Sequence, residues 1–333
     1  MGTILELMQG YAKKVEKELN RLFPPDLEPL PLTKASRHLI DAGGKRFRPC
    51  LALAACEAVG GRAEDALETA AALEFLHSFT LIHDDIMDRD EFRRNVKTVH
   101  TIWGEPIAII AGDALFAKVF EAIAANLKRI KMEKRRAIEI FDTISKASFE
   151  ICQGQALDML FEGRWDVGED EYLKMVSGKT GALTEASTKV GALLGGGGAG
   201  QVRALADYGR LLGIAFQIKD DILGIAGKKE KFGKPIGSDI REGKRTLIAL
   251  HALKNTSKEK RKFLLKVLGN KNASEEELHM AIEIMKKAGS VNYASRKARE
   301  FMALAKSKIA PLPASKGKDV LLKIADFTVE REF

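Results

Sequence analysis

Cysteine is scarce in this chain and forms no bridging or ligand pattern. The 333 residues include 3 cysteines, Cys50, Cys56 and Cys152, and none of them belongs to a CxxC pair. An odd number of thiols without such spacing argues against a disulfide framework and against a sulfur-bound metal. The pattern is typical of reduced, mostly structural cysteines in an intracellular protein.

Long apolar runs are also absent. No stretch reaches the roughly 20 residues that a transmembrane helix needs. The first residues carry Glu6, Lys13, Lys14 and Glu16 at helical spacing where a signal peptide would have an apolar core. We therefore expect no integral membrane segment and a cytoplasmic location.

The net charge of +8 is not accompanied by the sequence motifs of a nucleic-acid-binding protein. The excess lies largely in the C-terminal third, around residues 254–262, where basic and acidic residues are interleaved as on a solvated surface. No RNA-binding aromatic strand, zinc-finger spacing or compact helix-turn-helix pattern accompanies it. We expect no nucleic-acid partner.

Alternating β-branched patterns are rare, and helical periodicity dominates. Apolar residues recur at three- and four-residue spacing, as in Leu5, Met8, Tyr11 and Val15. Glycine and proline clusters, among them the glycine run at 195–198, mark the ends of about ten to twelve helices. With 45% hydrophobic residues the chain can bury a large core. The sequence predicts an all-α protein, and we expect residues 1–333 to form a single domain.

Two aspartate clusters interrupt these apolar helical segments: Asp84-Asp85-Ile86-Met87-Asp88 and Asp220-Asp221. Residues four apart share a helix face, so Asp84 and Asp88 project together and repel each other unless a cation intervenes. Mg²⁺ prefers carboxylate oxygens, water and substrate phosphates as ligands. Because the flanking residues are too apolar for a solvated acidic face, the clusters predict a shared cavity in which several metal ions bind a diphosphate.

Basic residues beside the first cluster predict a place for a second anion, because guanidinium groups bind phosphate oxygens through paired hydrogen bonds. His77 lies seven residues before Asp84 and returns to nearly the same helix face, either as a phosphate donor or as a packed core histidine. The basic candidates near the first cluster are Lys45, Arg46, Arg48, Arg93 and Arg94, and Lys179, Lys234 and Lys244 are further cations.

Taken in order, these motifs resemble the trans-isoprenyl diphosphate synthase (polyprenyl synthetase) family, which joins prenyl units head to tail. A DDxxD motif alone is weak, but the ordered set is specific and covers nearly the whole chain. The resemblance implies an isoprenoid-synthase-type helical bundle around a central cavity, and a homodimer. The segments that carry it are 43–49, 81–88, Arg93-Arg94, Gly154-Gln155, Asp158, Lys179-Thr180, 216–221, Lys234 and Lys244.

The resemblance also implies a role for each site residue. Asp84, Asp88 and Asp220 hold about three Mg²⁺ ions on the allylic diphosphate. Asp85 and Asp221 complete the catalytic aspartates, and Asp221 and Gln217 form part of the wall around the allylic group. The expected contacts of the allylic diphosphate are Arg93, Lys179, Thr180, Gln217, Lys234 and Lys244. Those of isopentenyl diphosphate, which needs no metal, are Lys45, Arg48, His77 and Arg94.

One position departs from the family pattern. The second motif of the family commonly reads DDxxD, whereas Gly224 stands here at its fifth position. One carboxylate is therefore missing, and Asp239 is the candidate that would replace it.

The residues below the first motif bear on product length. Phe79, five residues before Asp84, lies about 7.5 Å below it by helix rise, and Thr80 lies at roughly the same level. Helix geometry alone leaves open which of them forms the floor of the tail cavity. An aromatic residue five positions before the motif, with no insertion, is similar to archaeal-type geranylgeranyl synthases. We expect a C20 product, with a farnesyl (C15) or mixed C15/C20 product as the alternative.

Two other functions fit parts of the pattern. A class I terpene cyclase is also all-α with an aspartate-rich helix, but it takes one diphosphate and leaves Lys45, Arg48 and Arg94 without a role. A catalytically silent regulatory subunit would be expected to lose the aspartates or the basic motif, and both are present. The chemistry expected from the residues is ionisation of a carbon–oxygen bond, because metal ions and basic side chains neutralise the departing diphosphate electrostatically. No dedicated protein base is visible.

Overall fold

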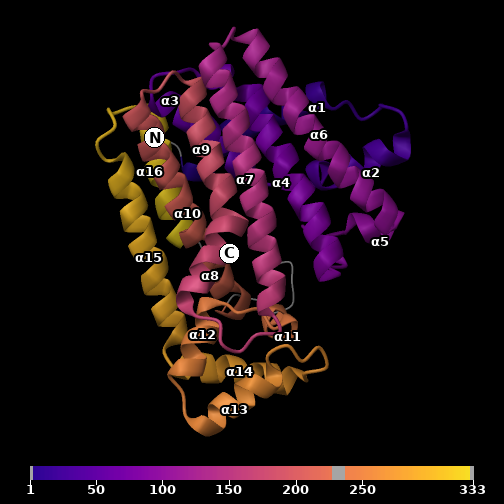
Figure 1. The fold of residues 1–333 in the computed structure, drawn as a ribbon, viewed down its shortest axis with the longest axis vertical. Helices are drawn as coiled ribbons and strands as arrows, with labels where there is room; N and C mark the ends of the chain where they lie inside the picture. Colours follow the sequence, from indigo (N-terminus) through magenta and orange to yellow (C-terminus); the bar gives the residue numbers. More distant parts are fainter. Residues whose placement is uncertain (1–2, 227–236, 331–333) are drawn as a thin grey trace. The chain divides into compact units, whose positions relative to one another are not determined.

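The structure, a computed structural model, describes residues 3–226 and 237–330. Within these ranges the chain is almost entirely helical, which confirms the predicted fold class (Figure 1). The helix labels run to α16, beyond the ten to twelve helices expected. The excess comes from short helices, such as α5 and α11 with 5 residues each, whose periodicity is too brief to read from sequence.

The chain forms two compact units. Unit 1 comprises residues 1–145, 183–206 and 309–324, and unit 2 comprises 146–182, 207–308 and 325–333. The elements up to residue 129 are α1 (Ile4–Leu22), α2 (Leu30–Asp41), α3 (Phe47–Ala58), the 3₁₀ helix η1 (Ala63–Ala66), α4 (Leu67–Asp88), β1 (Phe92–Arg93), β2 (Val96–Lys97), α5 (Val99–Trp103) and α6 (Glu105–Arg129).

The later elements include helices with residues in both units. They are α7 (Lys134–Phe161), α8 (Glu169–Val176), the π-helical turn η2 (Ser177–Gly181), α9 (Ala182–Leu194), α10 (Ala199–Ala226), α11 (Ser238–Glu242), α12 (Leu247–Lys254), α13 (Lys258–Val267), α14 (Glu275–Lys287), α15 (Ser290–Ile309) and α16 (Lys316–Glu330). The glycine run at 195–198 joins α9 to α10, so its prediction as a helix connection is confirmed.

Helix α4 is the central element of unit 1, because α1, α2, α3 and α6 all pack against it (Figure 1). The segment from Ala70 to Leu76 is buried all round, including the polar side chain of Glu74. A helix that is apolar on every side is stable only in such a position. Its last turn therefore projects the first aspartate cluster from a rigid support.

The chain leaves α4 through a tight turn and a small hairpin that the sequence analysis did not foresee. Arg89 ends the helix in the left-handed conformation with φ 57°. Strands β1 and β2 then pair with Phe92 opposite Lys97, and the two-residue loop Arg94-Asn95 has positive φ at both positions. Such primed turns match the twist of a hairpin. The hairpin brings Arg93 back over the end of α4.

Unit 2 has its own hydrophobic core, in which α8, α10 and α12–α14 bury their apolar faces. Helices α12, α13 and α14 contact one another and lie together in Figure 1. Ser274 begins α14 with a capping box that Glu277 completes. None of the helices described is long and apolar enough to cross a membrane.

Candidate active site

The first aspartate cluster ends α4, and its three carboxylates have different surroundings. Asp84 is half-buried with its side chain 19% exposed, whereas the side chain of Asp85 is 1% exposed. Asp88, one turn after Asp84, is also half-buried. Asp84 and Asp88 are therefore more accessible than Asp85 within this motif.

Arg93 neutralises the buried member of the cluster. From β1 its Nε donates to Asp85 Oδ1 at 2.7 Å, and its Nη2 lies 3.7 Å from Asp84 and 3.2 Å from Asp90. Burial raises the pKa of Asp85 to about 6, although the charge of Arg93 acts in the opposite direction. An arginine among three carboxylates can turn to an incoming phosphate, so this geometry is compatible with the predicted role of Arg93.

Arg94 and Arg46 belong to a basic region beside α4. Arg94 Nη1 donates to the carbonyls of Leu39, at 2.8 Å, and Gly43. A side chain at Gly44 would meet that guanidinium, because its Cβ would lie 3.1 Å from Nη1. The buried Arg46 pairs with Glu74 at 2.9 Å, which explains why this basic residue is structural.

His77 lies among the arginines of this basic region. Burial lowers its pKa first, and the charges of Arg48, Arg94, Arg93 and Arg46 lower it further, in that order. Its Nδ1 has no hydrogen-bond partner among the residues described. Three of the four predicted isopentenyl diphosphate contacts, His77, Arg48 and Arg94, thus share one positive region. Lys45 lies exposed just before α3.

Phe79 belongs to a ladder of aromatic rings in unit 1. Its ring centroid lies 5.1 Å from Phe116, which lies 5.2 Å from Phe120, and Phe120 lies 6.4 Å from Phe141. Thr80 turns its hydroxyl back to the carbonyl of His77 at 2.8 Å. Phe79 is therefore the side chain of this level that continues into neighbouring helices. Phe116 and Phe120, four apart on α6, were not predicted, since their spacing is equally typical of a core stripe.

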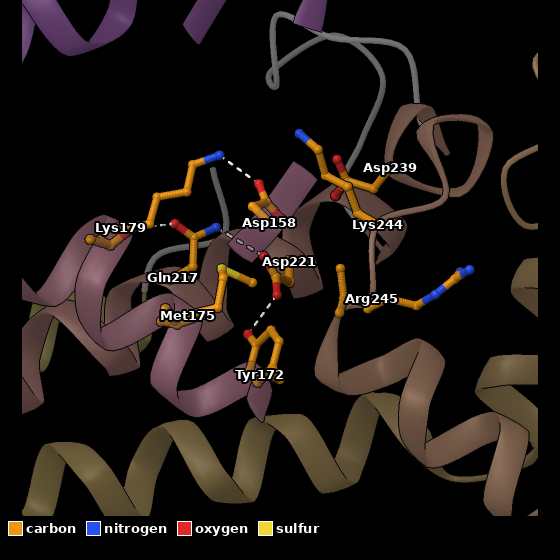
Figure 2. Close-up of a pocket in the computed structure, with 12 residues that line it drawn as sticks. Asp158, Tyr172, Met175, Lys179, Gln217, Asp221, Asp239, Lys244 and Arg245 are labelled. Atoms are coloured by element: carbon orange, nitrogen blue, oxygen red, sulfur yellow. Dashed lines mark hydrogen bonds and ion pairs between the residues drawn. The ribbon is translucent and has the colours of Figure 1, made fainter. Parts of the chain in front are cut away.

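A pocket in unit 2 gathers five predicted residues: Lys179, Thr180, Gln217, Asp221 and Lys244 (Figure 2). Asp158, one of the residues that carry the family likeness, and Asp239, the predicted substitute carboxylate, line the same pocket. Its remaining lining residues, Tyr172, Met175, Val176, Arg245 and Thr246, gave no signal in the sequence beyond helical periodicity. Lys234 lies outside the described residues.

Lys179 reaches the pocket because of the π-helical turn η2. A Cβ on Gly154 of α7 would lie 2.1 Å from the backbone nitrogen of Lys179, so α7 and η2 can touch only through a glycine. Lys179 Nζ donates to Asp158 Oδ2 at 2.6 Å. Single π turns inside helices are frequent at functional sites, and this one turns Lys179 and Thr180 toward the pocket.

A chain of three hydrogen bonds crosses the pocket wall (Figure 2). Thr180 Oγ1 donates to Gln217 Oε1 at 2.8 Å, and Gln217 Nε2 donates to Asp221 Oδ1 at 2.9 Å. Tyr172 then donates its hydroxyl to Asp221 Oδ2 at 2.6 Å. Burial and the nearby charge of Asp239 raise the pKa of Asp221 to about 7, against the effect of the two donors.

Gly224, the fifth position of the second motif, faces Asp239. A Cβ at Gly224 would lie 3.0 Å from Asp239 Oδ2. The carboxylate of Asp239 thus stands next to the space that an aspartate side chain at position 224 would need. Asp239 also acts on Asp221, as does Asp220. The geometry supports Asp239 as the substitute for the missing carboxylate.

The carboxylates of both clusters suit Mg²⁺, which binds hard oxygen donors and keeps waters and substrate phosphates as further ligands. Within residues 3–226 and 237–330, no group of three or more acidic, histidine or cysteine side chains is arranged to hold a metal by itself. In unit 1 the buried Asp85 Oδ2 has no hydrogen-bond partner in the part of the chain described. The donor set fits a metal that a phosphate helps to hold.

The chain belongs to the polyprenyl synthetase family, whose model matches residues 30–285. It is 45% identical over 332 residues, the full length of both chains, to the short chain isoprenyl diphosphate synthase of Methanothermobacter thermautotrophicus. It is 42% identical over 331 residues, 99% of each chain, to the geranylgeranyl diphosphate synthase of Methanosarcina mazei.

Solved structures agree with this family. The geranylgeranyl pyrophosphate synthetase from Pyrococcus horikoshii matches with a TM-score of 0.92 and 42% identity over 98% of each chain. The polyprenyl synthase from Caulobacter crescentus, complexed with calcium and isoprenyl diphosphate, matches with a TM-score of 0.89 and 31% identity, covering 99% of this chain and 97% of its own. The isoprenoid-synthase fold expected from the motifs is therefore confirmed.

Proposed function

We propose that this protein condenses isopentenyl diphosphate with dimethylallyl, geranyl and farnesyl diphosphates and forms geranylgeranyl diphosphate (C20) as its main product. The observation that carries the proposal is the pocket in unit 2, which gathers five of the residues expected around an allylic diphosphate. Relatives over the full chain length are named for this activity.

The proposed roles divide between the two clusters. Asp84, Asp88 and Asp220 would hold about three Mg²⁺ ions, and these would neutralise the departing diphosphate. Arg93, Lys179, Thr180, Gln217, Lys234 and Lys244 contact the allylic substrate. Lys45, Arg48, His77 and Arg94 bind isopentenyl diphosphate without metal, because arginine and a neutral histidine suffice for one anion.

The residues assist a substitution in which the protein supplies charge and shelter. The allylic carbon–oxygen bond breaks with its electron pair on the diphosphate, while Lys179 and Lys244 stabilise that charge. The double bond of isopentenyl diphosphate forms the new carbon–carbon bond, and the proton then lost goes to diphosphate. Met175 and Val176 keep water from the cation at the pocket wall.

The C20 product rests on the aromatic ladder that begins at Phe79. A growing tail that descends beside α4 meets the Phe79 ring, which Phe116 supports from α6. The ladder continues through Phe120 to Phe141, so the Phe79 ring is backed by further rings and limits the length of the tail. A farnesyl or mixed product stays the alternative, and chain length is read directly from the products.

The proposal also covers the domain organisation, the oligomeric state and the location of the protein. Residues 1–333 act as one functional domain. The protein works as a homodimer, for which the exposed Ile109 and Ile110 on α6, at 46% and 49%, offer apolar surface. It acts in the cytoplasm, where its three free cysteines stay reduced.

One assay tests this function. The purified protein is incubated with Mg²⁺, isopentenyl diphosphate and each allylic diphosphate in turn, and the hydrolysed alcohols are separated by chromatography. We expect diphosphate release with each partner, a C20 alcohol as the main product and no turnover with EDTA. No release with any partner would refute the proposal, and a hydrocarbon formed without isopentenyl diphosphate would identify a terpene cyclase.

A further inference from the structure

Tyr172 is a fully buried tyrosine whose hydroxyl enters the wall of the unit 2 pocket. It lies on α8 with 1% of its surface exposed. Its hydroxyl donates to Asp221 Oδ2 at 2.6 Å from behind, on the side away from Lys179 in Figure 2. A buried tyrosine needs a hydrogen-bond partner, but a backbone carbonyl would serve equally well. Here the partner is a carboxylate of the second aspartate cluster.

Both oxygens of Asp221 are occupied by donors from the protein itself. Oδ2 accepts from Tyr172, and Oδ1 accepts from Gln217 Nε2, which lies one turn earlier on α10. Gln217 and Asp221 lie on one face of the same helix, so the hydrogen bond between them does not fix either side chain relative to another helix. Tyr172 comes from another helix and fixes the carboxylate relative to α8.

The orientation of the Gln217 amide follows from this arrangement. An amide has a donor end and an acceptor end, and a half-turn exchanges them. Since Nε2 donates to Asp221, Oε1 is directed to Thr180, which donates to it at 2.8 Å. The carbonyl oxygen of Gln217 is thereby held next to Thr180 at the pocket wall.

We propose that Tyr172 is a positioning residue for prenyl transfer: its hydroxyl holds Asp221 so that Asp221 fixes the Gln217 amide beside Thr180. This inference rests on the proposed function, which places Gln217 and Thr180 against the allylic substrate. Tyr172 itself acts through Asp221 and not on the substrate. These contacts give the two neighbouring aspartates different roles. Asp221 accepts hydrogen bonds from Tyr172 and Gln217, and Asp220 serves as the metal ligand.

The competing explanation is that Tyr172 only fills the core of unit 2. Tyr172→Phe separates the two, because it removes the hydroxyl and keeps the ring. Tyr208→Phe is the matched control: Tyr208 is also fully buried, lies on α10 and does not line the pocket. Both variants are expected to lose similar thermal stability, so any further difference reports on the pocket.

The first measurement does not depend on activity. The chain has five glutamines, Gln9, Gln153, Gln155, Gln201 and Gln217, so selective ¹⁵N labelling gives a small set of side-chain amide signals. Gln217→Met assigns the signals of Gln217 by their disappearance. We expect Tyr172→Phe to shift or broaden those signals and Tyr208→Phe to leave them in place. Unchanged Gln217 signals in Tyr172→Phe would overturn the inference, whether or not the protein transfers prenyl groups.

The second measurement is a kinetic split. Tyr172→Phe should lower kcat about tenfold through misplacement of wall groups, with little change in KM for the allylic diphosphate. In a double-mutant cycle with Asp221→Asn, the losses should be clearly less than multiplicative, because Tyr172 acts through Asp221. Wild-type kcat in Tyr172→Phe, or fully multiplicative losses, would refute the positioning role. An inactive wild-type protein would instead refute the proposed function.

Discussion

The two aspartate clusters share a sequence pattern, but their buried members are held by opposite kinds of partner. In the first cluster Asp85 is neutralised by a cation, Arg93, that a hairpin supplies. In the second, Asp221 is held by two neutral donors, Tyr172 and Gln217. A charged partner can exchange one anion for another, whereas neutral donors anchor a carboxylate in place. The buried carboxylate of the first cluster therefore has an exchangeable partner, whereas that of the second is anchored in place.

The accessible aspartates of the first cluster should matter most. Asp84→Ala combined with Asp88→Ala removes the two proposed metal ligands of this cluster and should lower kcat/KM by about 1000-fold or more. The measurement is diphosphate release at saturating Mg²⁺. Asp90→Ala is the matched control, because Asp90 also contacts Arg93 but lies beyond the motif. If the double variant keeps more than a tenth of the activity, the first cluster is not the metal site.

The incomplete second motif can be tested by exchanging carboxylates. Gly224→Asp places a second negative group beside Asp239, since its Cβ would lie 3.0 Å from Asp239 Oδ2. Like charges this close repel, and we expect about a tenfold loss of kcat. Adding Asp239→Gly should recover most of that loss, with Asp239→Gly alone as the control. A gain of activity from Gly224→Asp alone would show that Asp239 does not replace the missing group.

A change in product length should result from a substitution near the first cluster and not from one near the second. Phe79→Ala removes the first ring of the aromatic ladder below the first cluster and should lengthen the product beyond C20. The rate should change only a few-fold, because the diphosphate contacts stay. Chromatography of the hydrolysed alcohols gives the outcome. Tyr172→Phe, on the side of the second cluster, should leave the chain length unchanged; a shift there and none in Phe79→Ala would reverse the assignment.

The smallest effect concerns stability. The pKa of Asp221 is raised to about 7, and an unfolded aspartate titrates near 4. A raised folded-state pKa stabilises the protein below the unfolded value, and that contribution is lost as pH rises from about 4 through 7. Asp221→Asn should therefore reduce the fall in melting temperature between pH 5 and pH 8, by the equivalent of about 2–3 kcal/mol. An unchanged fall would locate the titration elsewhere.

The charged residues of the candidate site could be predicted from the sequence because metal and phosphate chemistry demands charged side chains at fixed spacing, whereas Thr180 and Gln217 were predicted from the family resemblance. Asp84 and Asp88 share a helix face by periodicity alone. Lys179, Thr180, Gln217, Asp221 and Lys244 were predicted, and all line one pocket. Tyr172 and the supporting ring of Phe116 were missed, because a buried aromatic residue at helical spacing looks the same in any core.

The sequence by itself determined the helical fold class, the family and the set of charged residues, since periodicity and motif order are local or linear properties of the chain. Only the tertiary structure decided which aspartate of each pair is accessible and what holds its neighbour. Arg93 reaches Asp85 through a hairpin with a primed turn, and Tyr172 reaches Asp221 from a separate helix. Burial and pairing depend on elements distant in sequence, so linear spacing does not reveal them.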